Sequence, residues 1–146
     1  MYKNLNPTEI VDIYTDGNYH SYDGIATWGF VVVKNNKEIY REKGNITDKI
    51  TLEGWQVGAE LEAVKQGIEY CKKNNYKCNI FYDYIGVFNW VKDLFNKGKP
   101  WKTKKPYTKE YRKFIGENKD YINSYSWVKG HSGDKFNEEV DGFISR

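Results

Sequence analysis

Short runs of apolar residues, separated by polar or glycine-containing breaks, recur along the chain and are typical of β-strands. The run over residues 10–16 is followed by Gly17, which we expect to end the strand. Asn35 and Asn36 are expected to form the tight turn between the second and third strands. The strands expected from these runs cover residues 10–16, 28–34, 38–42, 78–83 and 125–129.

A helical repeat of apolar residues occupies the middle of the chain, from about Trp55 to Asn74. Its apolar positions recur every three or four residues, which indicates a helix with one buried face. They are Val57, Leu61, Val64, Ile68 and Cys71. Shorter helices are expected over residues 87–95 and 108–116, and a last one after the loop 130–136. The order βββαβα(α)βα predicts an α/β fold with a mixed five-stranded sheet flanked by helices.

Length and composition predict one globular domain. Of the 146 residues, 39% are hydrophobic and 29% are charged, which is enough apolar material for a core. Two cysteines, Cys71 and Cys78, are too few for a disulfide scaffold or a zinc site, so we expect buried thiols. Neither an apolar leader nor a run of membrane-spanning length is visible, so we expect a cytoplasmic protein without membrane contact.

Positive charge is concentrated in one segment, although the whole chain carries only +3. Residues 92–113 hold nine basic and two acidic residues, a net charge of +7, so the remaining residues together carry −4. Trp90, Phe95 and Trp101 are interleaved with these lysines or flank them. A basic segment beside acidic residues suits an enzyme that cleaves phosphodiesters, because lysines attract the backbone while carboxylates bind metal. A solvated lysine-rich loop is the alternative.

Two carboxylates stand where an apolar strand ends. Asp16 closes the first strand, and Asp83 closes the fourth. If these strands are parallel neighbours, their last residues lie at the same edge of the sheet, where ligand sites gather in α/β folds. Asp is also common in turns and helix caps, so the positions alone leave both interpretations open.

Two further carboxylates lie on expected helices. Glu60 falls at the border of the apolar stripe, where it can point over the sheet, whereas Glu62 is expected to face solvent. From geometry alone, an ordinary boundary residue is the favoured interpretation of Glu60. Asp141 in the final helix carries no signal by itself. Three or four carboxylates without a cluster of Cys or His suit Mg²⁺ or Mn²⁺ and not zinc.

Taken together, these residues resemble the type 1 ribonuclease H family over nearly the whole chain. The matching segments, in order, are Tyr14-Thr15-Asp16-Gly17, Ala59-Glu60-Leu61, Tyr82-Asp83, Trp127-Val128-Lys129-Gly130-His131-Ser132-Gly133 and Asn137-Glu138 with Asp141. W-V-K-G-H before N-E-x-x-D is the most specific part. The resemblance implies a single ribonuclease H domain over residues 1–146, an endonuclease that hydrolyses the RNA strand of RNA–DNA hybrids. The implied products carry 5′-phosphate and 3′-hydroxyl ends.

The resemblance also implies which residues act. Asp16, Glu60, Asp83 and Asp141 are the implied catalytic residues and ligands of two Mg²⁺ ions, with Mn²⁺ as a substitute. His131 would relay a proton or assist product release. The basic segment resembles the protrusion with which bacterial members grip the hybrid, and we expect a monomer. The expected substrate contacts are Gly17, Asn18, Gln56, Trp90, Lys99, Trp101, Lys102, Lys104, Lys105 and Asn137.

Three departures from the family pattern leave the substrate preference open. Tyr84 follows the third Asp where Ser is usual, residues 55–58 replace an Asn-rich stretch, and residues 18–23 replace a glycine-rich loop. Among the alternatives, resolvases, integrases and transposases share the fold but act on DNA and lack W-V-K-G-H. A domain that holds hybrids without cutting is disfavoured by the presence of all four carboxylates. A structural partner domain of a polymerase stays open.

Overall fold

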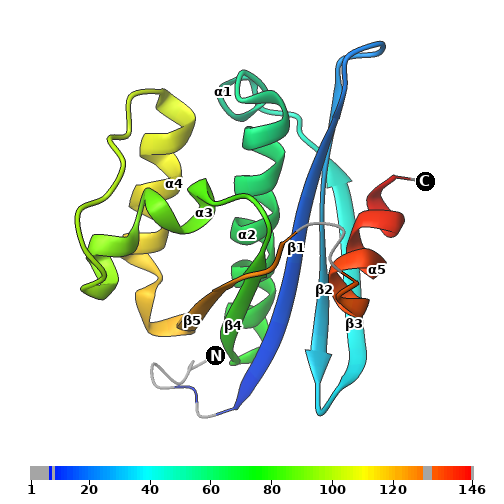
Figure 1. Ribbon diagram of the computed structural model, residues 1–146, viewed down its shortest axis with the longest axis vertical. Helices are drawn as coiled ribbons and strands as arrows, with labels where there is room; N and C mark the ends of the chain where they lie inside the picture. Colours follow the sequence, from blue (N-terminus) through cyan, green and yellow to red (C-terminus); the bar gives the residue numbers. More distant parts are fainter. Residues whose placement is uncertain (1–6, 8, 130–132, 146) are drawn as a thin grey trace.

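Five strands form one mixed sheet at the centre of the molecule (Figure 1). The computed structural model describes residues 7, 9–129 and 133–145. The strands are β1 (Ile10–His20), β2 (Ile25–Lys34), β3 (Lys37–Asn45), β4 (Lys77–Tyr82) and β5 (Ile122–Trp127). Their order is β3-β2-β1-β4-β5; the β1–β2 and β2–β3 pairs are antiparallel, and the β1–β4 and β4–β5 pairs are parallel. The expected mixed sheet flanked by helices is confirmed.

Helices cover both faces of this sheet. The longer ones are α2 (Trp55–Asn74), α4 (Pro106–Glu117) and α5 (Lys135–Ile144). Shorter ones are α1 (Lys49–Leu52), α3 (Gly86–Asn89) and the 3₁₀ helices η1 (Lys92–Phe95) and η2 (Lys119–Tyr121). Figure 1 shows α2 and α4 on one side of the sheet and α5 on the other. None of the helices in the described part of the chain has the length and apolar character needed to cross a bilayer.

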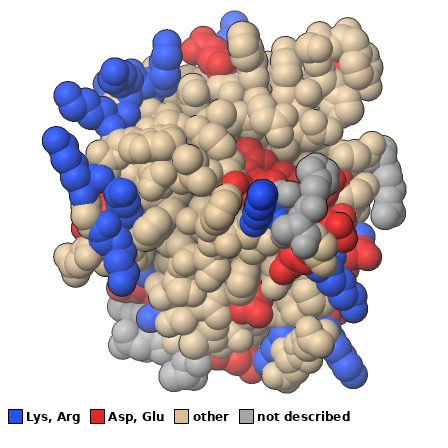
Figure 2. Space-filling view, viewed as in Figure 1, with Lys and Arg blue, Asp and Glu red and all other residues tan. Residues whose placement is uncertain are grey.

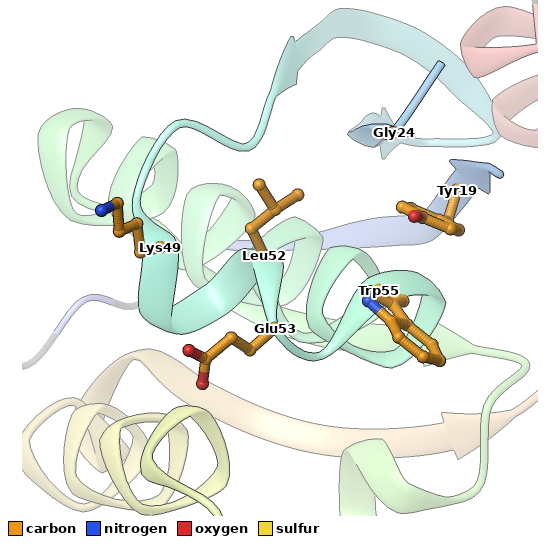
Figure 3. Close-up of a pocket in the computed structure, with 6 residues that line it drawn as sticks. All are labelled: Tyr19, Gly24, Lys49, Leu52, Glu53 and Trp55. Atoms are coloured by element: carbon orange, nitrogen blue, oxygen red, sulfur yellow. The ribbon is translucent and has the colours of Figure 1, made fainter. Parts of the chain in front are cut away.

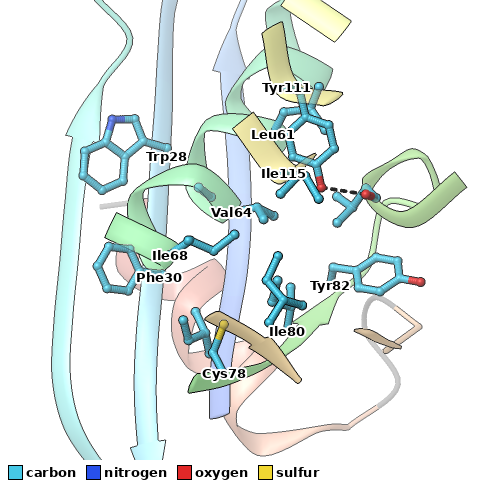
Figure 4. Packing of buried hydrophobic residues seen from close by; sticks show 14 of the residues in the cluster. Trp28, Phe30, Leu61, Val64, Ile68, Cys78, Ile80, Tyr82, Tyr111 and Ile115 are labelled. Carbon is cyan, nitrogen blue, oxygen red and sulfur yellow. Dashed lines mark hydrogen bonds between the residues drawn. The ribbon is translucent and has the colours of Figure 1, made fainter. Parts of the chain in front are cut away.

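Side chains of the strands build two cores, because successive residues of a strand point to opposite faces. Ile13 of β1 belongs to the core under α2, whereas Tyr14 belongs to the core under α5. In the larger core, Tyr111 of α4 is fully buried, and its hydroxyl donates a hydrogen bond of 2.6 Å to the carbonyl oxygen of Val87 (Figure 4). The expected buried thiols are confirmed, since Cys71 and Cys78 are buried and unpaired.

Several expectations about the elements were wrong, and two of them concern strand length, since β2 begins three residues before Trp28 and β3 ends three residues after Glu42. Residues 87–95 form α3 and η1 in place of one helix, because the Val87 carbonyl accepts from Tyr111 and the Val91 amide bonds to Phe88. The last strand begins at Ile122, which pairs with the start of β4, and not at Tyr125. The first strand does not end at Gly17 but continues to His20.

The extra length of β1 creates the place for a site. Pairing of β1 with β4 stops where Tyr14 lies opposite Phe81, while pairing with β2 continues to His20. Residues 15–20 of β1 therefore have no strand neighbour on the β4 side. Side chains of α2 form hydrogen bonds with the β1 backbone there.

Candidate active site

Three carboxylates meet where β4 ends beside β1. One carboxylate oxygen from each of Asp16, Glu60 and Asp83 lies within 4.8 Å of the other two. Asp16 comes from β1 and Asp83 directly follows β4, so their proximity results from the parallel pairing of these strands. Glu60 reaches the same point from α2. Asp16 and Glu60 are buried, with 6% and 5% of their surface exposed.

Gly17 allows α2 to approach β1 closely enough for this arrangement. A Cβ atom on Gly17 would lie 2.3 Å from the Glu60 backbone nitrogen and 2.4 Å from the Ala59 carbonyl carbon. The Gly17 amide donates hydrogen bonds to Glu60 Oε1 at 2.5 Å and to Asp16 Oδ1 at 2.9 Å. The glycine of the T-D-G segment is thus required for contact between strand and helix, not for a turn.

Replacing Gly17 by Ala is expected to lower the rate of the hybrid cleavage that the family resemblance implies by roughly 10²-fold, because displacing a catalytic group by about 1 Å has that effect. The added methyl group meets backbone atoms of α2, which cannot rotate away. Turnover on an RNA–DNA hybrid measures the effect, and circular dichroism shows whether the variant folds. Gly116→Ala on α4 is the matched control, because a Cβ there meets only Leu94 at 4.0 Å. Equal activity of the two variants would contradict the role of Gly17.

Burial of the carboxylates makes their charges unfavourable. Burial raises the pKa of Asp16 from 3.8 to about 7. A hydrogen bond with Glu60 lowers this pKa, whereas the nearby Asp83 and Asp141 raise it further. Burial likewise raises the pKa of Glu60 well above its ordinary 4.5, with Asp16 and Asp83 contributing. Repulsion between carboxylates this close is relieved either by protonation or by a bound cation. Because the donors are all carboxylate oxygens, they fit Mg²⁺ or Mn²⁺.

Asp141 approaches the cluster from α5, on the other side of the sheet. It lies near enough to Asp16 to raise the pKa of that carboxyl, although it is outside the group of three. Asp134 caps the N-terminus of α5, because its carboxylate accepts a hydrogen bond of 3.0 Å from the backbone amide of Asn137. Asn137, an expected substrate contact, is itself buried. His131 lies outside the described residues.

Gln56 and Asn18, two expected substrate contacts, form hydrogen bonds within the protein. The Gln56 amide donates from Nε2 to the Gly17 carbonyl oxygen at 2.6 Å and accepts at Oε1 from the Tyr19 amide at 3.1 Å. This side chain therefore bonds to β1 where no β4 residue pairs with it. Asn18 Nδ2 lies 3.0 Å from His20 Nε2. Contact with substrate stays a prediction for both residues.

The part of the basic segment that joins η1 to α4, residues 96–105, is mostly exposed. Lys99, Lys102, Lys104 and Lys105 are all exposed. Trp101 packs edge-on against Trp90, with ring centroids 5.5 Å apart. Arg112 of α4 donates two hydrogen bonds of 2.7 Å to Asp93 of η1, which joins the two ends of the segment. Figure 2 shows Lys and Arg side chains along the left edge, on the side where Figure 1 places this segment.

The expectation that Glu62 faces solvent was wrong. Its side chain is only 13% exposed, because Gln66 donates to it at 2.7 Å and Lys65 lies 3.6 Å away. Glu62 is nevertheless not part of the carboxylate cluster.

The sequence interpretation did not predict that Trp127 bonds to the segment that carries Asp83. Its indole Nε1 donates to the Asp83 backbone oxygen at 2.8 Å, and the next amide, of Val128, donates to the Tyr82 carbonyl oxygen at 2.7 Å. These bonds tie the end of β5 to the segment that carries Asp83. The W-V pair at the start of the W-V-K-G-H segment was the signal that could have indicated this.

Comparisons with known proteins agree with this geometry. The family model described as RNase H matches residues 8–146. The chain is 32% identical to a ribonuclease H of Ruthia magnifica, with 91% of each chain covered. It is 33% identical to a ribonuclease H of Hahella chejuensis, covering 90% of this chain and 88% of the relative.

Solved structures share the fold at lower sequence identity. RNase H1 from Halobacterium salinarum superposes with a TM-score of 0.73 at 18% identity, covering 93% of this chain and 95% of that one. LC11-RNase H1 in complex with an RNA/DNA hybrid gives a TM-score of 0.66 at 17% identity, covering 92% and 96%. By its match to the family model and to these relatives, the chain belongs to the ribonuclease H family.

Proposed function

We propose that this protein is a ribonuclease H that hydrolyses the RNA strand of RNA–DNA hybrids as an endonuclease, leaving 5′-phosphate and 3′-hydroxyl ends. The observation that carries the proposal is the cluster of Asp16, Glu60 and Asp83 at the C-terminal end of β4, in which Asp16 and Glu60 are buried. Membership of the ribonuclease H family and the fold shared with LC11-RNase H1, which was solved with an RNA/DNA hybrid, support it.

Asp16, Glu60, Asp83 and Asp141 are proposed to hold two divalent cations, Mg²⁺ or Mn²⁺. Bound cations would stabilise charge on the phosphate and lower the pKa of the attacking water. Asp16 is proposed as the central ligand, because one of its oxygens lies within 4.8 Å of Glu60 and Asp83 and because Asp141 on α5 is near enough to affect its pKa. The Gly17 amide keeps Glu60 and Asp16 oriented through its two hydrogen bonds.

The strand that is cut is proposed to lie along β1 and the start of α2. The RNA 2′-hydroxyl distinguishes RNA from DNA at a single position. Glu60 belongs to the carboxylate cluster, and Gly17 is bonded to both Glu60 and Gln56. We therefore propose that the 2′-hydroxyl is contacted by Glu60, Gly17, Asn18 and Gln56. His131 is proposed to relay a proton or aid product release, and Asn137 to contact substrate. Trp90, Trp101 and the exposed lysines of the basic segment are proposed to bind the backbone of the hybrid.

We further propose that residues 1–146 act as one domain, as a monomer in the cytoplasm. The buried, unpaired thiols of Cys71 and Cys78 suit a reducing compartment.

The test is incubation with matched RNA–DNA, RNA–RNA and DNA–DNA duplexes of one sequence, with and without Mg²⁺. We expect cleavage of the RNA strand of the hybrid alone, dependent on the cation. Mapping the product ends distinguishes 5′-phosphate from 5′-hydroxyl termini. Cleavage of DNA duplexes would favour a DNA-directed nuclease of the same fold, and binding without cleavage would favour a domain that only holds hybrids.

Removing the charges of Lys99, Lys102, Lys104 and Lys105 is expected to raise the Michaelis constant more than it lowers turnover. These lysines are exposed and lie outside the carboxylate cluster. Lysines bound to phosphates release counterions. A plot of the logarithm of affinity against the logarithm of salt concentration therefore falls with a slope of about 0.9 per phosphate contact for B-form duplex. The quadruple Gln variant should therefore show a shallower salt dependence. Lys72 and Lys73 on α2 serve as control positions, and an unchanged slope in the quadruple variant would identify the segment as a solvated loop.

A further inference from the structure

Trp55, the first residue of α2, occupies an unfavourable position that the fold does not explain. It is 63% exposed, so little of its ring contributes to the core. Its φ angle is 51°, in the left-handed region that a bulky side chain rarely adopts and that glycine adopts freely. Such backbone strain is unfavourable, and it clusters at functional sites. The exposure and the strained backbone of Trp55 together indicate a residue that is kept for binding and not for stability.

The Trp55 ring faces an open pocket together with Tyr19 of β1. The two ring centroids are 6.0 Å apart and their planes differ by 19°. The pocket has a volume of about 320 Å³ and is also lined by Leu52, Lys49, Glu53 and Gly24. Figure 3 shows both aromatic rings on one side of Leu52, with Lys49 and Glu53 on the other. The pocket thus combines flat aromatic surfaces with one cation and one carboxylate.

The two elements that carry the aromatic rings, β1 and α2, also carry two residues of the carboxylate cluster. Tyr19 is three residues beyond Asp16 on β1, and Trp55 is five residues before Glu60 on α2. Five residues of helix correspond to roughly 7.5 Å. Gln56 fixes the two elements to each other through its bonds to Gly17 and Tyr19. A nucleic-acid strand bound at the cluster would therefore pass the aromatic pocket within one or two nucleotides.

We propose that Trp55 and Tyr19 form a stacking site for an unpaired nucleobase next to the bound hybrid. Bases inside a duplex hide their faces against one another, whereas an unpaired base exposes a π-face that stacks on aromatic rings whatever its sequence. Lys49 would attract the adjoining phosphate, and Glu53 would accept from an exocyclic amine of the base. The site would favour hybrids flanked by single-stranded segments over blunt ones. The proposal rests on the proposed function only for where the strand lies.

The test uses the intact chain and hybrids in which one strand, RNA or DNA, carries a single-stranded extension with 2-aminopurine as its first unpaired base. Extensions at each end of the RNA strand and of the DNA strand, together with a blunt hybrid, complete the set. Binding is followed in EDTA at low salt, where stacking on the protein quenches the 2-aminopurine fluorescence. We expect quenching with at least one extension, and tighter binding of that hybrid than of the blunt one by about fivefold or more.

Trp55→Gly is the informative variant, because glycine removes the ring and relieves the positive φ, so folding is preserved. It should abolish the quenching and the affinity gain of the extension while leaving blunt-hybrid affinity unchanged. Trp55→Phe should restore both effects in part. Tyr40→Ala is the control, since Tyr40 forms another surface stack, with Tyr70, at 4.4 Å.

Two results would overturn the stacking site: no quenching by the unsubstituted protein with any of the RNA or DNA extensions, or an equal loss of affinity for blunt and extended hybrids in Trp55→Gly. Failure of the proposed function is separable from both. Quenching of 2-aminopurine without cleavage of any hybrid in Mg²⁺ would support the stacking site and contradict the proposed function. Cleavage of the hybrid without quenching would contradict only the stacking site.

Discussion

Replacing Asp16 by Asn is expected to reduce hybrid cleavage by roughly 10²–10³-fold or more at saturating Mg²⁺. A bound cation contributes several kcal/mol of transition-state stabilisation, and each 1.36 kcal/mol is a factor of ten in rate. Asn keeps the shape of the side chain and one oxygen, but it removes the charge at the residue on which the other carboxylates converge. Turnover of a hybrid over a Mg²⁺ titration measures the loss.

Hybrid affinity should change little in the same variant, because the exposed lysines of the basic segment are unaffected. Asp12→Asn is the matched control. Asp12 lies four residues earlier on β1, where it accepts a hydrogen bond from Asn79 at 3.0 Å and is not part of the cluster. Activity of Asp16→Asn within about tenfold of the unsubstituted protein would exclude Asp16 as a central metal ligand.

The same substitution is expected to stabilise the protein in the absence of metal. The pKa of Asp16 in the folded chain, about 7, exceeds its ordinary 3.8, so folding favours the protonated form. This contribution to stability is complete below about pH 4 and is lost as the pH rises through 7. Asn has no charge to desolvate. The Tm of the variant in EDTA should therefore exceed that of the unsubstituted protein at pH 8, and the difference should narrow at pH 5.

Much of the arrangement around Asp16 and Asp83 could be predicted from the sequence. The apolar run before Asp83 correctly placed that residue at the end of β4, whereas Asp16 lies inside β1, just beyond the last residue that pairs with β4. The parallel pairing of β1 with β4 brings the two carboxylates together, as the sequence predicted. Glu60 was a weaker prediction, because its angle on α2 identifies only a residue at the border of the buried face. The resemblance of Ala59-Glu60-Leu61 to the family's helix motif identified Glu60 as a catalytic candidate, which helical periodicity alone could not do.

Other features depend on packing between distant segments, which a local pattern does not record. Gly17 was interpreted as the end of a strand, although its lack of a side chain serves the contact with α2. The break between α3 and η1 follows from the bond between Tyr111 and Val87, 24 residues apart. Trp55 gave no sign of its positive φ, since left-handed geometry is expected of Gly or Asn.

Replacing Glu60 by Gln is expected to damage cleavage far more than replacing Glu62, by roughly 10²-fold or more relative to that control if Glu60 binds a cation. The carbonyl oxygen of the introduced amide would still accept the hydrogen bond from the Gly17 backbone nitrogen, so the fold at this contact is kept while the charge is lost.

Glu62 is a stringent control, because it lies on the same helix within two residues and is also partly buried. Its partners are Lys65 and Gln66 on the surface of α2, so Glu62→Gln removes an ion pair without touching the cluster. Turnover of both variants on one hybrid, at several Mg²⁺ concentrations, gives the comparison. Equal losses, or a larger loss in Glu62→Gln, would mean that the carboxylate of Glu60 faces the cluster without holding the cation, and the metal site would then have to be assigned to Asp16, Asp83 and Asp141 alone.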